Sequence, residues 1–312
     1  MTSADALVNF PWPRPFEKDA TPEWTGQGFC VGDEKRRVLV FDAEQSHWSP
    51  ELTKLHEEEA GSDHPIDRAS RQAAVRSVCH FRTAERPIIL DVGCSSGYLL
   101  RAIRKSLPQA APIGSDYLGA PLLELAERMP DLPFLQFDLR RCPLPDACVD
   151  VVTALNVLEH IDRDEEALAQ IFRILRPGGL AHIECPAGPH LFDVYDEYLM
   201  HHRRYRTADL VSMARRVGFE VLRATHLGFL VYPAFWFVKK RNRWRARRSR
   251  GEAAGQVKAH IRDTGTSMLM ATLMRLELAL STVMNFPFGI RSVLILRKST
   301  GDKTMNAVDL KK

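Results

Sequence analysis

Cysteine is sparse in this sequence of 312 residues, and the six cysteines include no C-x-x-C pair. Scattered cysteines of this kind indicate neither a zinc site nor a disulfide framework, and they fit a reducing compartment best. The N-terminus also lacks the basic-then-apolar pattern of a signal peptide. The sequence therefore predicts a cytoplasmic protein without a metal site.

Hydrophobic runs long enough to span a membrane are lacking as well. The apolar segment Leu227–Val238 has twelve residues, whereas a membrane-spanning helix needs about 20. Acidic residues are missing from 239–250, KKRNRWRARRSR, which holds eight bases. The net charge of +4 depends on that segment, because the remainder carries 35 bases against 39 acids. The apolar fraction of 45% is typical of a globular protein.

The most informative segment is Pro87–Ala102, which reads PIILDVGCSSGYLLRA. A short apolar run leads into Asp91, a loop with two glycines follows, and an apolar-periodic stretch comes next. This order is typical of the strand–loop–helix corner of an open α/β sheet, where bare backbone and a helix N-terminus are open to a ligand. A carboxylate at this corner repels a pyrophosphate but suits a ligand with an ammonium or a sulfonium group.

This segment resembles motif I of the class I S-adenosylmethionine-dependent methyltransferases, which usually reads D/E-x-G-x-G-x-G. Ser95 stands where the family has its middle glycine. The resemblance implies a Rossmann-like α/β fold with a seven-stranded doubly wound sheet and helices on both faces. It also implies that S-adenosyl-L-methionine is the cofactor and that Asp91, Gly93, Cys94 and Gly97 bind it.

Acidic residues follow two further predicted strands. Asp116 comes 25 residues after Asp91, which suits one βαβ step, and an acid there can accept hydrogen bonds from both ribose hydroxyls of a nucleoside. In the resembled family, Asp138 occupies the position that holds the adenine amino group, and Tyr117 and Leu139 flank the base. A helix cap is the alternative interpretation of Asp116, and capping of the next turn is the alternative for Asp138.

The segment Asp150–Ile161, DVVTALNVLEHI, is similar to the fourth-strand motif of the same family. By its position, Asn156 bounds the methionine end of the cofactor. Glu159 and His160 follow beside the transferred methyl group. Because a histidine has an ordinary pKa of about 6.5, His160 is the candidate general base for an acceptor hydroxyl. Capping or packing of the following helix is the alternative interpretation of His160.

A charged segment follows the fifth predicted strand, where the family often carries an H-x-R-x-Y/F pattern. His202, Arg204 and Tyr205 match this pattern and are, with Glu159, the candidates for the substrate pocket or its lid. The alternative is that they latch this loop to the acids just before it.

The remaining segments surround this core. We expect an N-terminal arm and lid-like helices over 1–84, the cofactor-binding core over 85–228, a helical hydrophobic and basic insertion over 229–290, the last core strand over 291–298 and a polar tail over 299–312. Within them, we expect a hairpin over Phe29–Phe41 that turns at Gly32-Asp33, helices over Glu51–Ala60 and Ile66–Phe81, a helix capped by Thr207 that ends at Gly218, and a closing antiparallel pair of Glu220–Thr225 with Ser292–Leu296.

The segment Leu227–Arg250 joins aromatic side chains directly to clustered bases. This combination suits a helix lying in a membrane interface, where each base near an anionic surface contributes about 1 kcal/mol. It predicts an anionic membrane surface as partner and a peripheral position on the inner face of a membrane. RNA binding and a solvated basic face are the alternatives, and nucleic acid has no use for the adjoining apolar run.

The sequence thus predicts methyl transfer from S-adenosylmethionine to an oxygen of a small or lipid-linked substrate. The alternatives are an RNA-directed methyltransferase, an NAD-linked Rossmann oxidoreductase and a non-catalytic membrane or RNA adaptor on this fold. The NAD-linked alternative shares Asp116 but lacks the glycine spacing of a dinucleotide site and leaves Asp138 without a role.

Overall fold

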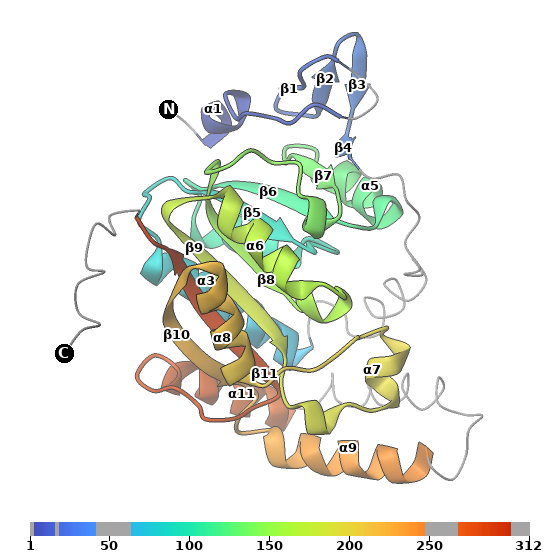
Figure 1. Ribbon diagram of the computed structural model, residues 1–312, viewed down its shortest axis with the longest axis vertical. Coiled ribbons are helices and arrows are strands. Elements are labelled where there is room, and N and C mark those ends of the chain that lie inside the picture. The colour runs from blue at the N-terminus through green and yellow to red at the C-terminus, as the bar shows by residue number, and fades with distance from the viewer. Residues whose placement is uncertain (1–2, 16–18, 42–63, 247–267, 301–312) are drawn as a thin grey trace, which may run out of the picture.

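The computed structural model describes residues 3–15, 19–41, 64–246 and 268–300. These ranges form a three-stranded antiparallel sheet near the N-terminus and an eight-stranded sheet with the order β10-β11-β9-β8-β5-β6-β7-β4 (Figure 1). The strands of the larger sheet are β4 Val38–Val40, β5 Ile88–Val92, β6 Ala111–Asp116, β7 Phe134–Gln136, β8 Val149–Leu155, β9 Leu175–Pro186, β10 Phe219–Leu227 and β11 Arg291–Lys298.

The pairing directions agree with the predicted doubly wound α/β fold. From β9 to β4 all neighbouring strands are parallel, whereas β11 is antiparallel to both β9 and β10. The predicted closing antiparallel pair is therefore confirmed. Because the other strands run in one direction, their carboxyl ends share one edge of the sheet, which is where open α/β sheets bind ligands.

Helices cover both faces of the eight-stranded sheet (Figure 1). Along β5, Ile89 packs among residues of α3 and α4, whereas Leu90 packs in the core that contains α6 and α8. Successive apolar residues thus serve opposite faces, as in a strand buried on both sides. The helices are α3 Pro65–Phe81, α4 Tyr98–Ser106, α5 Gly119–Arg128, α6 Asp164–Ile174, α7 Val194–Tyr198, α8 Thr207–Val217, α9 Tyr232–Ala246 and α11 Met268–Leu280, with short 3-10 turns η1 Leu139–Arg141, η2 Leu158–His160 and η3 Pro189–Leu191.

The sheet has one strand more than the seven expected from the sequence. The predicted turn at Gly32-Asp33 is present, but it joins β2 (Phe29–Val31) to β3 (Glu34–Arg36). The following strand, β4, leaves this hairpin and pairs in parallel with β7 at the edge of the larger sheet. Leu39 is fully buried there. A run of three apolar residues suits either sheet, and only the tertiary contacts choose between them.

The expected N-terminal arm is packed by its aromatic side chains. It begins with a short helix, α1 (Ser3–Val8), and continues to the small sheet through a cluster of buried aromatic rings. The ring of Trp12 lies 4.5 Å from that of Phe10 and 4.9 Å from that of Phe29. Aromatic contacts at these distances give an irregular segment an apolar core of its own.

Two predictions about helices are corrected. The predicted helix at Ile66–Phe81 exists as α3, but Ala74 and Val78 pack against the sheet, so α3 is a layer helix rather than a lid. The predicted helix Glu51–Ala60 lies outside the described residues.

Thr207 does not cap α8, because the N-cap position belongs to Arg206. The Oγ1 atom of Thr207 instead lies 2.7 Å from Oγ of Ser292.

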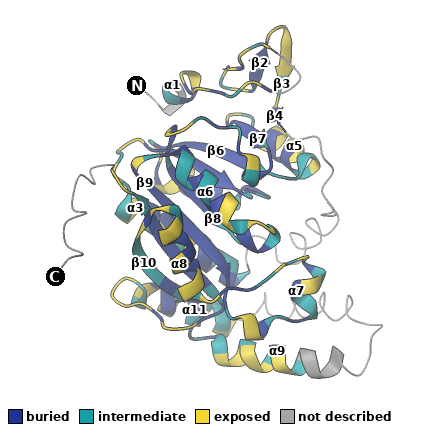
Figure 2. Ribbon diagram, viewed as in Figure 1, coloured by how far each residue is buried: buried dark blue, intermediate teal, exposed yellow. Residues whose placement is uncertain are grey.

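Among the described residues between β10 and β11 lie the helices α9 and α11, in agreement with the helical insertion expected there. α11 packs on α3 and β11 through Met274 and Leu278, whereas α9 lies at the periphery and exposes part of its surface (Figure 2). Among the described residues, no helix combines the length and apolar character needed to cross a membrane. The basic residues at 247–250 lie outside the described residues.

Substitution in β4 tests whether this strand belongs to the larger sheet. Leu39→Ala removes a fully buried side chain and should lower the free energy of unfolding by about 2–5 kcal/mol, because it leaves a cavity. Val40→Ala, at the adjacent position that is 37% exposed, should change it by only about 0.5 kcal/mol. Denaturant unfolding measures both values. Equal, small changes would contradict the placement of β4.

Candidate functional site

The loop between β5 and α4 has the conformation that its glycines permit. Gly93 and Gly97 adopt positive φ angles of 69° and 72°, which side chains rarely tolerate. A Cβ atom at Gly93 would lie 2.7 Å from Cγ2 of Val157, in the loop after β8. The glycine therefore allows the motif I loop and the loop after β8 to approach each other. Gly97 is the N-cap residue of α4.

Ser95, which replaces the family's middle glycine, keeps the backbone conformation of a glycine. Its φ angle is 47°, in the left-handed region that costs a non-glycine residue about 1–3 kcal/mol. Its backbone N–H donates a hydrogen bond of 3.0 Å to Oδ2 of Asp116. The N–H of Cys94 donates to the carbonyl oxygen of Ser115 at 2.9 Å. The loop is thus tied to the end of β6 despite the substitution.

Asp91 lies within β5, one residue before the strand ends, and is buried. Thr153 of β8 donates a hydrogen bond of 2.7 Å to its Oδ1 atom. Burial raises the pKa of Asp91 to about 7. The hydrogen bond from Thr153 lowers this pKa, whereas the nearby charge of Asp116 raises it further. A positively charged ligand would stabilise the ionised form. The site therefore suits a cationic group beside Asp91.

Asp116 ends β6 and is partly exposed at the sheet edge. Its Oδ1 atom accepts a hydrogen bond of 3.1 Å from the N–H of Leu118, at the start of α5. The N-cap position of α5 belongs to Leu118 and carries no side-chain cap, so Asp116 is not a helix cap and the capping alternative is wrong. A carboxylate offers about four acceptor positions, so these backbone hydrogen bonds are compatible with binding of hydroxyl groups. Tyr117, the next residue, is half-buried.

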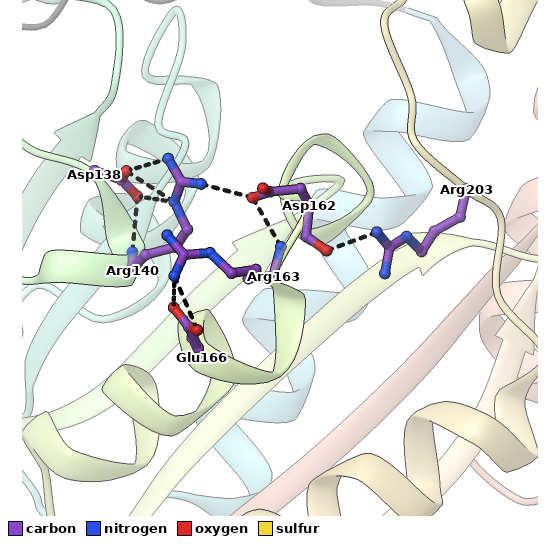
Figure 3. A network of polar contacts seen from close by, with 6 residues as sticks. All are labelled: Asp138, Arg140, Asp162, Arg163, Glu166 and Arg203. Carbon is purple, nitrogen blue, oxygen red and sulfur yellow. Dashed lines mark hydrogen bonds and ion pairs between the residues drawn. The ribbon is translucent and has the colours of Figure 1, made fainter.

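Asp138 forms part of a charged network (Figure 3). Arg140 donates to its carboxylate from Nε and Nη2, the latter at 2.6 Å, and pairs through Nη1 with Asp162 at 2.6 Å. Asp138 also caps η1 through the backbone N–H of Arg140. The capping alternative is therefore observed, and an adenine amino group would have to share this carboxylate with Arg140. Leu139 is buried in the core.

The residues after β8 lie close to the motif I loop. Asn156 has a positive φ of 55°, a conformation that asparagine tolerates, and its N–H donates to the carbonyl oxygen of Glu184 at 2.8 Å. Glu159 and His160 belong to η2. The ring of His160 lies edge-on to the ring of His201, with centroids 4.6 Å apart. The sequence had placed His160 at this site, but not beside His201.

Glu159 is fully buried, and neither oxygen of its carboxyl group has a hydrogen-bond partner among the described residues. Burial raises its pKa to about 8. A buried polar group without a partner is rare in folded proteins and is often explained by an ion or a water molecule. Glu159 is therefore the least satisfied acidic side chain near the carboxyl ends of the strands.

Of the three residues in the H-x-R-x-Y/F pattern, two are buried and one is exposed. Arg204 and Tyr205 are buried: Nε of Arg204 donates to Oδ1 of Asp196 at 2.7 Å, and the hydroxyl of Tyr205 lies 2.8 Å from Oδ2 of Asp164. Arg204 therefore latches the loop to an acid just before it, as the alternative interpretation held, whereas Tyr205 binds an acid of α6. His202 is exposed, and its N–H donates to the carbonyl oxygen of Glu159.

A buried ion cluster joins α9 to this loop. Nζ of Lys239 donates to Asp193 at 2.5 Å and to Asp196 at 3.0 Å, and all three side chains are buried. Although burial alone would raise it, the pKa of Asp196 lies well below its ordinary value because of a hydrogen bond with His201 and the charges of Lys239 and Arg204. One base of the predicted membrane-facing patch is thus internal.

A second buried network was not predicted from the sequence. Oε1 of Glu184, in β9, accepts from Oγ of Ser70 at 2.5 Å and from Nη1 of Arg291 at 2.8 Å, and Arg291 also pairs with Asp67. These residues come from α3, β9 and β11, which are far apart in the chain. A network between such distant residues cannot be predicted from a local sequence pattern.

Comparison with known proteins identifies the domain. Residues 90–183 match the family described as "Methyltransferase domain". A probable S-adenosylmethionine-dependent methyltransferase of Mycolicibacterium smegmatis is 33% identical over 135 residues, which cover 43% of this chain and 52% of the relative. A malonyl-acyl-carrier-protein O-methyltransferase of Halalkalibacterium halodurans is 32% identical over 117 residues, covering 35% and 43%. The chain spans about half the length of these curated relatives.

A solved structure agrees at the level of the fold. Phosphoethanolamine N-methyltransferase 2 of Haemonchus contortus, in complex with S-adenosyl-L-methionine, has a TM-score of 0.53 and 15% identity, covering 82% of this chain and 58% of that chain. The fold is a Rossmann-like α/β domain. Residues 90–183 carry a methyltransferase-domain sequence, and the relative from Mycolicibacterium smegmatis is named as S-adenosylmethionine-dependent. These matches favour S-adenosyl-L-methionine over NAD as the ligand of this domain.

The ion cluster of Lys239 makes a testable contribution to stability. Lys239→Met leaves two acidic side chains buried without their lysine and should lower the free energy of unfolding by about 3–5 kcal/mol. Lys240→Met, at the adjacent exposed position, should lower it by less than about 1 kcal/mol. Denaturant unfolding of both variants measures the difference. Equal effects would show that the cluster does not hold α9 in place.

Proposed function

We propose that this protein transfers the methyl group of S-adenosyl-L-methionine to an oxygen atom of a small or lipid-linked acceptor. The observation that carries the proposal is the convergence of Asp91, Asp116 and Asp138 at the carboxyl ends of three adjacent parallel strands. These strands follow one another in the sheet, so the three acids line a single edge. Three acids at successive strand ends suit a nucleoside that also carries cationic groups.

The residues of this edge fit the parts of the cofactor. Asp91, with its raised pKa and buried position, would hold the ammonium group, and Asp116 would accept hydrogen bonds from the ribose hydroxyls. Asp138 would accept from the adenine amino group, with Tyr117 and Leu139 beside the base. Gly93, Cys94 and Gly97 would contact the cofactor through their backbone, and Asn156 would bound the methionine end.

Methyl transfer to the acceptor oxygen requires little chemical activation by the protein. The sulfonium group of the cofactor activates its methyl group, so the chain mainly has to position the acceptor oxygen in line with it. His160 is the candidate base that removes a hydroxyl proton where the acceptor is not already ionised. The name of the malonyl-acyl-carrier-protein relative supports oxygen as the acceptor atom. RNA-directed methylation and a non-catalytic adaptor are the alternatives.

Calorimetry with S-adenosylmethionine, S-adenosylhomocysteine and NAD tests the cofactor assignment. Asp116→Ala should weaken binding of both sulfur-containing ligands by about 100-fold or more, because each hydrogen bond to a charged group contributes about 1.5–3 kcal/mol. Asp131→Ala, which removes an exposed acid paired with Arg104, is the matched control and should bind normally. Tighter binding of NAD, or full binding by Asp116→Ala, would contradict the proposal.

We further propose that the protein works at an anionic membrane surface through the described part of α9. Trp236 is 39% exposed and Phe237 is 63% exposed, and Lys240 lies over the Trp236 ring at 4.9 Å. Exposed aromatic rings beside lysine suit the headgroup region of a bilayer. An acceptor with a lipid tail would be presented at the same surface.

Flotation with anionic vesicles tests the membrane proposal. Replacement of Trp236 and Phe237 by alanine should weaken association by about 10-fold or more, since burial of each ring contributes about 1.5–3 kcal/mol. Leu123→Ala removes an apolar side chain that is 50% exposed on α5 and should leave association unchanged. Wild-type protein that stays with the unbound fraction would exclude this surface as a membrane contact.

A further inference from the structure

Three side chains with metal-binding atoms converge beside the proposed methyl-transfer site. Glu159, His160 and His201 each offer one ligand atom, and these atoms all lie within 4.8 Å of one another. Glu159 and His160 come from η2, whereas His201 comes from the loop after α7. Among the described residues, this is the one group of three or more such side chains close enough to share an ion.

The carboxyl group of Glu159 supplies an independent observation. It is fully buried and has no hydrogen-bond partner among the described residues, although leaving a buried carboxyl group unsatisfied costs several kcal/mol. A cation bound at this position would provide a partner for the carboxyl group.

The environment of His201 resembles the usual support of a metal-binding histidine. Its Nδ1 atom lies 3.1 Å from Oδ1 of Asp196, which is itself fully buried. A carboxylate that accepts the N–H of one ring nitrogen fixes the ring and leaves the other nitrogen available to a metal ion.

We propose that Glu159, His160 and His201 bind a divalent transition-metal ion of the zinc class. Two imidazole nitrogens and one carboxylate oxygen are ligands that Zn²⁺ and Co²⁺ prefer, whereas Mg²⁺ and Ca²⁺ prefer sites built of oxygen atoms. Three protein ligands leave at least one coordination position for water or for an oxygen of another molecule.

Binding of this ion changes what His160 can do. A ring nitrogen that coordinates an ion cannot accept a proton, so metal binding and action as a general base are alternative states of His160. The proposal depends on the three side chains and not on methyl transfer. Its test therefore contains no methylation reaction, and its failure would leave the proposed function standing.

The experiment measures metal content and cobalt absorption of the untagged full-length chain. Protein freed of metal with a chelator is titrated with Zn²⁺, Co²⁺ or Mg²⁺, and each variant is compared with the wild type. Glu159→Gln and His201→Asn should each lose one equivalent of Zn²⁺ per chain, or bind it about 100-fold more weakly. Asp196→Asn should weaken binding by about 10- to 100-fold, because it removes the support of His201. Melting curves of the metal-free variants check that they fold.

His202→Asn is the matched control, because His202 is the exposed neighbour of His201 and is not part of the cluster. It should bind Zn²⁺ like the wild type, and Co²⁺ should give the visible absorption of nitrogen and oxygen coordination in both. Wild-type binding by a folded His201→Asn variant would overturn the proposal, even where Glu159→Gln fails to fold. Equal loss in His202→Asn, or binding of Mg²⁺ in preference to Zn²⁺, would also overturn it.

Discussion

Burial of the Asp91 carboxyl group is the constraint on which the arrangement of the site depends. The group lies inside a parallel sheet, and Thr153 of the adjacent strand donates a hydrogen bond to it. Burial raises its pKa to about 7, so the protein keeps an acid there that a cationic ligand can ionise. Thr153 of β8 and the charge of Asp116 at the end of β6 both act on this group. The proposed cofactor site is therefore organised around a side chain of the sheet.

The opposite side of the site depends on a chain of buried charges. Lys239 from α9 neutralises two acids near α7, and Asp196 in turn holds Arg204 and His201. His201 faces the ring of His160. The segment between β10 and β11 is thus tied through Lys239 to the loop that carries His201. The same helix exposes Trp236 on its outer surface, so its two sides serve different environments.

Features that depend on local patterns were predictable from the sequence. The apolar run before Asp91 and the two glycines after it specify a strand, a turn with positive φ and a helix, and all three are observed. Contacts between distant segments were not predictable. Leu39 joined the large sheet instead of the hairpin, and Tyr205 turned inward to bind Asp164 of α6. Each outcome depends on a partner from another part of the chain.

The sequence by itself determined the alternating strands and helices, the acids at the strand ends and the cofactor class, because periodicity and motif spacing are local properties of a chain. Tertiary structure alone decided that Glu159 is buried without a partner, that His201 lies beside His160, and that Lys239 is internal while Lys240 is exposed. Burial and electrostatic pairing are set by which distant segments pack together. Two adjacent lysines in one basic run therefore look alike in the sequence and differ completely in the folded protein.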